Sequence, residues 1–158
     1  MRISVIVLLL SLSSLALPAN RAQAAQCDVT ATSINFGSYD VFSSIPVDST
    51  ASINVTCKIP SNSPQAPLPV VISLSPGNSG SFSPRSMQST GADTLDYNLY
   101  TNASMSTIWG DGGGSSSVQT ALVAKDMPWN ATLFGRIPPR QNVSAGSYSD
   151  TITVTIDF

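Results

Sequence analysis

The sequence contains no histidine and no glutamate, and charged residues make up only 10% of it. Histidine is the side chain that most often serves as a general base, and glutamate is another common one. No G-x-S-x-G motif occurs, and the nearest aspartates, Asp93 and Asp96, fall on opposite faces of the strand expected there. We therefore expect no enzymatic activity, no cofactor and no small-molecule substrate.

Basic residues are also few. Of the seven lysines and arginines, Arg2 and Arg21 lie in the first 24 residues, so five remain beyond them (7 − 2 = 5) against nine acids, a net charge of −4. These five are scattered rather than clustered, which argues against nucleic acid as a partner. Asp111 in WGDGGG is a lone carboxylate, too few ligands for calcium, so we expect no metal site.

Long apolar runs are confined to the amino terminus. Arg2 precedes an apolar run over Ile3–Leu17, and small residues follow at Ala22 and Ala24. This run is too short for a spanning helix, and the order of features is that of a secretory signal peptide. We predict a signal peptide over residues 1–24, a single domain over 25–158, and export without a membrane anchor.

Cysteine is limited to Cys27 and Cys57. In an oxidising compartment the two can form one intramolecular bridge, and no C-x-x-C spacing suggests a redox role. Closing a loop of about 30 residues would stabilise the fold by roughly 3.5 kcal/mol in the chain-entropy model. We predict a structural disulfide.

Serine, threonine, glycine, asparagine and proline dominate the rest, and short alternating segments recur between turn-rich ones. Strands are expected at 32–36, 51–57, 70–74, 94–100, 118–124, 131–137 and 151–158, with loops at 59–69, 76–87 and 109–117. No helix of persuasive length follows residue 24. This pattern predicts an all-β, immunoglobulin-like antiparallel sandwich that is one strand short.

The last strand raises a particular question. Its apolar residues point one way and Thr151, Thr153, Thr155 and Asp157 the other, with no turn afterwards. An apolar face at a strand edge needs a cover, and we expect that cover to come from another polypeptide. The apolar residues concerned are Ile152, Val154, Ile156 and Phe158.

Several segments together resemble one known family: INFGSY (34–39), INVTC (53–57), PRSM (84–87), LDYNLYTN (95–102), WGDG (109–112), FGRIPPRQ (134–141) and GSYSDTITVTIDF (146–158). They are similar to the spore coat protein U domain, which is shared with the pilins of archaic, Csu-type chaperone–usher pili. The resemblance spans essentially the whole chain after residue 24. The order of the segments and the terminal G-x-Y-x-D-T-x-x-V pattern carry it.

The resemblance implies a pilin-like domain that lacks its final strand, and passage through the periplasm to the cell surface, a pilus or the extracellular space. A periplasmic chaperone would lend a strand, and a neighbouring pilus subunit would replace it at the outer-membrane usher. Four or five buried aliphatic side chains would contribute about 6–15 kcal/mol, comparable with the stability of a whole domain. We name the predicted site the acceptor groove and assign to it Ile34, Phe36, Ile152, Val154, Ile156 and Phe158.

The family's shaft pilins also carry a donor strand before their first cysteine. Here only Ala25 and Gln26 would stand between the predicted cleavage site and Cys27. We therefore expect a subunit that accepts a strand without donating one, at the tip or as a minor subunit. The alternative is a stand-alone spore-coat or outer-surface structural protein.

A second alternative is an adhesin module that binds surfaces, as in biofilm formation, through apolar loops. The candidate residues are Ile108, Trp109, Met127 and Trp129, since exposed apolar loop residues can dock on hydrophobic surfaces. The competing interpretation is that the tryptophans pack at the edges of the core.

Overall fold

A computed structural model describes residues 24–61, 63 and 67–158. The predicted signal peptide, apart from Ala24, lies outside these residues. The described part is all-β, as predicted, with strands β1 Gln26–Ala31, β2 Val47–Lys58, β3 Leu68–Leu74, β4 Arg85–Ser89, β5 Thr94–Tyr100, β6 Ile108–Trp109, β7 Ser116–Ser117, β8 Gln119–Val123, β9 Trp129–Ile137, β10 Tyr148–Ser149 and β11 Val154–Asp157. Within it, no helix is long and apolar enough to span a membrane.

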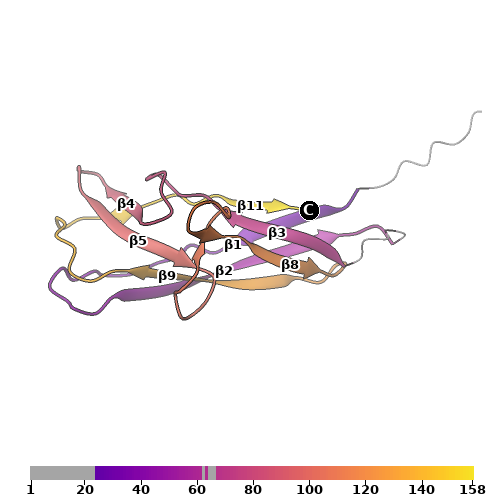
Figure 1. Cartoon of the computed structure of the whole chain (residues 1–158), viewed down its shortest axis with the longest axis horizontal. Coiled ribbons are helices and arrows are strands. Elements are labelled where there is room, and N and C mark those ends of the chain that lie inside the picture. Colours follow the sequence, from indigo (N-terminus) through magenta and orange to yellow (C-terminus); the bar gives the residue numbers. More distant parts are fainter. Residues whose placement is uncertain (1–23, 62, 64–66) are drawn as a thin grey trace, which may run out of the picture.

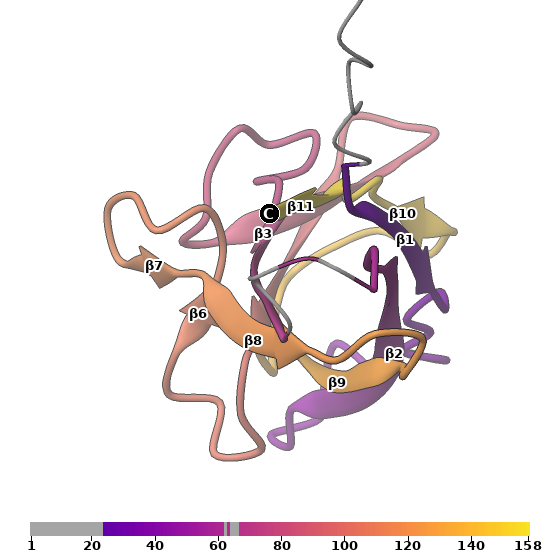
Figure 2. The ribbon, with the colours of Figure 1, turned by 90° about the vertical axis from the view of Figure 1, so that its right-hand side faces the viewer.

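Two sheets form the incomplete immunoglobulin-like sandwich (Figure 1). The larger sheet has the order β1-β2-β9-β5-β4-β10, with the short β6 paired to β5 and β7 paired to β6, and the smaller sheet has the order β11-β3-β8. Among the described strands every ladder is antiparallel except the two-residue pair β6–β7, and an isolated bridge between Cys57 and Lys125 is also parallel. Viewed along its long axis, the sandwich encloses its core between β3 and β8 on one side and β2 and β9 on the other (Figure 2).

The alternation of apolar and polar residues along the strands explains which side chains form the core. In β2, Ala51, Ile53, Val55 and Cys57 are buried while the residues between them are polar and more exposed. β2 pairs with β9 without a break from Val47↔Ile137 to Val55↔Trp129. The buried faces of β2, β9 and β5 pack on the buried face of β3 to form a continuous core.

Several sequence predictions differ from the structure: β3 begins at Leu68, within the predicted loop 59–69, and β7 lies within the predicted loop 109–117. Residues 32–36 form no strand, and β1 lies instead at 26–31. The Asn35 side chain accepts the Gly37 amide at 2.9 Å, so a local turn ends the extended run. β4 occurs in the stretch expected to be only turn-rich, and β11 begins at Val154 rather than at residue 151.

Candidate strand-acceptor site

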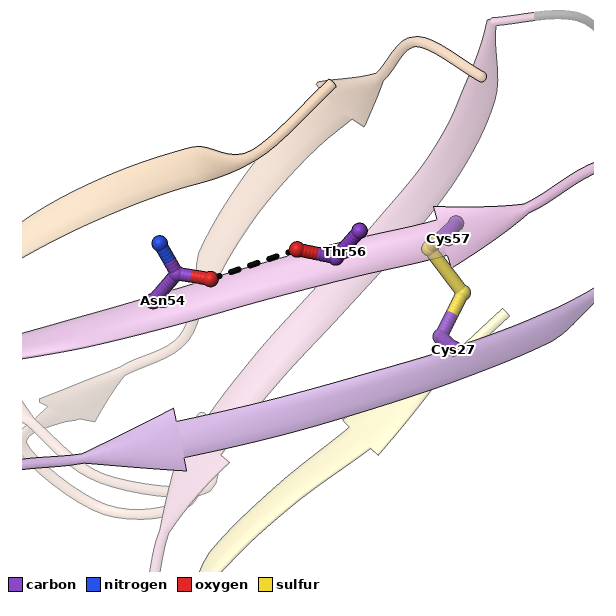
Figure 3. The surroundings of a disulfide bond; sticks show 4 residues. All are labelled: Cys27, Asn54, Thr56 and Cys57. Carbon is purple, nitrogen blue, oxygen red and sulfur yellow. Dashed lines mark hydrogen bonds between the residues drawn. A yellow bond between two sulfur atoms is a disulfide. The ribbon is translucent and has the colours of Figure 1, made fainter. Parts of the chain in front are cut away.

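The two cysteines form the predicted disulfide. Cys27 and Cys57 are directly opposite each other on β1 and β2, with their Cα atoms 4.1 Å apart. Figure 3 shows the bridge between these strands, beside Asn54 and Thr56, whose side chains are hydrogen-bonded at 3.3 Å. Because Cys57 is fully buried, the bridge attaches β1 to the rim of the core.

β1 and β11 are sheet edges that face each other. Each pairs with one neighbour among the described strands, β1 with β2 and β11 with β3. The two strands run close together in both views, one from each sheet, without a ladder between them (Figures 1 and 2). Unpaired backbone groups on such edges are a template for another strand.

Burial is incomplete along this side of the sandwich. The inward residues of β3 are at most 4% exposed, whereas those of β1, of the segment after it and of the last strand are only partly buried. Phe158 is 55% exposed. The partly buried set consists of Cys27, Val29, Ile34, Phe36, Ile152, Val154 and Ile156.

The predicted acceptor-groove residues fall into two groups. Ile34 and Phe36 pack over Gly135 of β9, and the Phe36 ring meets Tyr97 edge-on with centroids 6.0 Å apart. A cavity of about 630 Å³ lies beside them, bounded by residues 34–41 and 143–148. Ile156 and Val154 instead lie on β11 against β3, near β1. The structure thus places the two groups along the open side without bringing them into one cluster.

Hydrogen bonds between the segments INFGSY, LDYNLYTN and FGRIPPRQ, which carry the family resemblance, hold the wall of this cavity. The Gln141 side-chain amide accepts from the Asp96 amide at 2.7 Å and donates to the Asp96 carbonyl at 2.8 Å. The Gln141 side chain thus makes the hydrogen bonds to β5 that a neighbouring strand backbone would make, beyond the point where β9 has ended. The Tyr39 hydroxyl donates to the Pro138 carbonyl at 2.9 Å and accepts from the Gln141 amide at 2.8 Å. Sequence reasoning did not find this arrangement, because nothing local marks the partners.

Arg85 is buried at the start of β4. Its guanidinium donates to Asn98 Oδ1 at 2.8 Å, to the Trp109 carbonyl at 2.7 Å and to the Ser75 carbonyl, and lies 5.0 Å from the centre of the Phe82 ring. Burial lowers the pKa of Arg85 from its usual value, and nearby acidic groups oppose that shift. This network joins β4, β5 and β6, and it gives Arg85 of the PRSM segment a structural role.

The two tryptophans pack against the core, as the competing interpretation expects. Trp109 is fully buried and donates its Nε1–H to the Ile72 carbonyl at 3.0 Å, so it is a core residue and not a surface contact. Trp129 packs against the core and Ile108 is half-buried. Of the four candidates, only Met127, at 63%, is strongly exposed.

Sequence reasoning missed two exposed apolar residues in the turn before β2. Phe42 is 89% exposed and Ile45 is 71% exposed, in the turn that connects the first extended segment to β2. The Asp40 carboxylate accepts the Phe42 amide at 2.9 Å, and the Asp40 carbonyl accepts the Ser43 amide at 3.1 Å. The signal was the stretch VFSSIP, whose apolar residues follow no strand alternation.

Comparisons with known proteins agree with the geometry. The family model for the Spore Coat Protein U domain matches residues 14–155. Protein U of Myxococcus xanthus is 31% identical over 133 residues, covering 79% of this chain and 71% of that protein. A solved structure, the CsuC–CsuE chaperone–tip adhesion subunit pre-assembly complex from archaic chaperone-usher Csu pili of Acinetobacter baumannii, aligns with a TM-score of 0.59 at 27% identity. That alignment covers 85% of this chain and 40% of the other, so this chain spans less than half of the solved one.

Proposed function

Because the chain belongs to the spore coat protein U domain family, we propose that it is an exported subunit of an archaic chaperone–usher pilus, completed by a β-strand from another polypeptide. The observation that carries the proposal is the pair of facing edges, β1 and β11, beside apolar residues that are only partly buried. The similarity to a chain of the Csu chaperone–tip adhesion subunit pre-assembly complex supports it.

In this proposal a donor strand inserts between β1 and β11. Its backbone pairs with the free edge of β11, and its apolar side chains cover the inward face of the last strand. A periplasmic chaperone supplies the strand first, and a neighbouring pilus subunit replaces it at the outer-membrane usher. The acceptor groove, with Ile34, Phe36, Ile152, Val154, Ile156 and Phe158, is the surface that the donor covers.

The position in the fibre is a finer proposal. Residues 18–26 read PANRAQAAQ, without the apolar alternation that a donor strand requires. This supports a terminal or minor subunit that accepts a strand. Finding residues before Cys27 cross-linked into the groove of another subunit would contradict the terminal position and leave the pilus assignment intact.

Capture by a chaperone tests the main proposal. The full chain is co-expressed with a candidate periplasmic chaperone of an archaic chaperone–usher system, and the complex is recovered through a tag on the chaperone. Val154→Asp or Ile156→Asp should reduce recovery by about tenfold or more, since a charge would enter a desolvated groove. Thr153→Asp and Thr155→Asp point outward and serve as matched controls. Equal recovery of all four variants would refute the groove.

A stand-alone coat or surface role is the second candidate, and the similarity to Protein U favours it. It predicts that the protein still reaches the cell surface when the usher gene is deleted. The pilus proposal predicts retention in the periplasm in the same strain.

An adhesive role is compatible with the pilus proposal, and the exposure of Phe42 and Ile45 supports it. The double variant Phe42→Ser/Ile45→Ser should keep chaperone capture and surface display but reduce attachment to a hydrophobic surface. Thr132→Ser, an exposed substitution in β9, is the control. Unchanged attachment would remove this loop from consideration.

A further inference from the structure

The apolar alternation of the last strand leaves its register ambiguous. Residues 151–156 read TITVTI, so a shift by one residue would expose the apolar side chains, but a shift by two would exchange one apolar residue for another. The segment also changes sheets, since β10 pairs with β4 and β11 pairs with β3, and residues 150–153 lie between the two ladders. Hydrophobic burial alone therefore does not distinguish registers that differ by two residues.

Asp150 stands at this change of sheet and is held from three directions. Its Oδ2 accepts the Tyr97 hydroxyl at 2.7 Å, and its Oδ1 accepts the amides of Asn78 at 2.8 Å and Thr151 at 2.7 Å. Tyr97 comes from β5 and Asn78 from the turn after β3, so the carboxylate connects the last strand to both sheets. Charge-assisted bonds of this kind are stronger and more directional than neutral ones.

The neighbouring backbone is shaped to receive this carboxylate. A β-carbon at Gly77 would collide with the Asp150 carboxylate, and Gly77 has φ +76°, a conformation that favours glycine. Burial raises the pKa of Tyr97, and the hydrogen bond and charge of Asp150 raise it further, so the phenol remains a donor. Beyond Asp150, Ser75 and Thr153 exchange hydrogen bonds of 2.9 Å in line with the β3–β11 ladder.

We propose that Asp150 is a positioning residue that selects a single register for the last strand, and so sets where each apolar residue of the acceptor groove stands. A shift by two residues would move another residue to this position and break the bonds to Tyr97 and Asn78. The inference rests on the proposed function only for its second part, that a fixed register is needed to accept a donor strand.

Cross-linking measures the register without any partner. The pair Ser73→Cys/Thr155→Cys lies directly opposite in the native ladder, whereas Ser73→Cys/Thr153→Cys becomes opposite only after a two-residue shift. Asp150→Ala should raise the ratio of shifted to native cross-links by about tenfold or more, the effect of losing a charge-assisted hydrogen bond. Asp150→Asn should give a smaller rise than Asp150→Ala, because its Oδ1 can still accept the Asn78 and Thr151 amides, while its uncharged NH2 can only donate to the Tyr97 oxygen. Asp157→Ala is the control on the same strand.

A ratio in Asp150→Ala equal to wild type would overturn the proposal and leave Asp150 as a contributor to global stability alone. If that variant yields no folded protein, Tyr97→Phe tests the same bond with the ring retained; a smaller rise is expected, and no rise overturns the proposal.

Binding of a synthetic peptide in which valine alternates with serine tests the second part. Asp150→Ala should bind this peptide at least about tenfold more weakly than Asp150→Asn; equal binding would overturn the link to strand acceptance. Wild-type protein that fails to capture both this peptide and the chaperone would instead refute the proposed function, while the cross-link ratio would still decide the role of Asp150.

Discussion

Phe36 lies directly over Gly135 of β9: a β-carbon at residue 135 would stand 2.8 Å from Phe36 Cζ. The same β-carbon would stand 2.5 Å from Ile34 Cδ1. The segment after β1 can therefore cover the larger sheet only because β9 has no side chain at this point.

Gly135→Ala should destabilise the domain. The added methyl group would push Ile34 and Phe36 outward from a packed face, and such overpacking costs roughly 1–3 kcal/mol. Urea unfolding of the purified, bridged protein measures the loss. Gly146→Ala is the control, because a β-carbon there would meet nothing within 4 Å; equal stability of the two variants would contradict the packing.

Arg85 and Arg136 should differ sharply in their contribution to the free energy of unfolding. Arg85→Met would remove the guanidinium donor from the Ser75 and Trp109 carbonyls and would leave Asn98 Oδ1 with the Leu99 amide alone, at a cost of about 3 kcal/mol or more. Arg136→Met breaks a partly exposed ion pair with Asp48 and should cost less than about 1 kcal/mol. Similar free energies of unfolding for the two variants would contradict this assignment.

Trp109 should behave as a core residue. Trp109→Ser should lower stability by about 3–5 kcal/mol, since it opens a large cavity and orphans a carbonyl acceptor. Met127→Ser, in the exposed KDMPWN turn, should leave the melting temperature nearly unchanged. Equal melting temperatures would return Trp109 to the list of surface candidates.

Acid should weaken the fold through Asp48. The hydrogen bond from Arg136 holds the pKa of Asp48 below its usual value of 3.8. A carboxylate whose folded-state pKa is depressed contributes stability above its unfolded pKa and loses that contribution as the pH falls through the folded value. The free energy of unfolding should thus decline below about pH 4. Asp48→Asn should make this decline with pH slightly less steep. The difference should amount to less than about 1 kcal/mol in total, because solvent screens the ion pair. A slope unchanged by this substitution would show that the pair contributes nothing.

Much of the fold was predictable because it depends on local pattern. The alternation in residues 51–57, 94–100 and 131–137 predicted strands that the structure confirms within β2, β5 and β9. The two cysteines left one possible intramolecular bridge, and it is present. The half-buried alternation of the last strand was also legible, although β11 itself is shorter than predicted.

The composition and alternation of the sequence by themselves determined the all-β class, the disulfide and the apolar side of the last strand, since these depend on residue type and on neighbours along the chain. Only the tertiary structure decided that Trp109 is buried, that Phe42 and Ile45 are exposed, and that Asp150 meets Tyr97 and Asn78. The reason is physical: burial and hydrogen bonding join residues separated by dozens of positions, and no local pattern specifies which distant backbone will supply the partner.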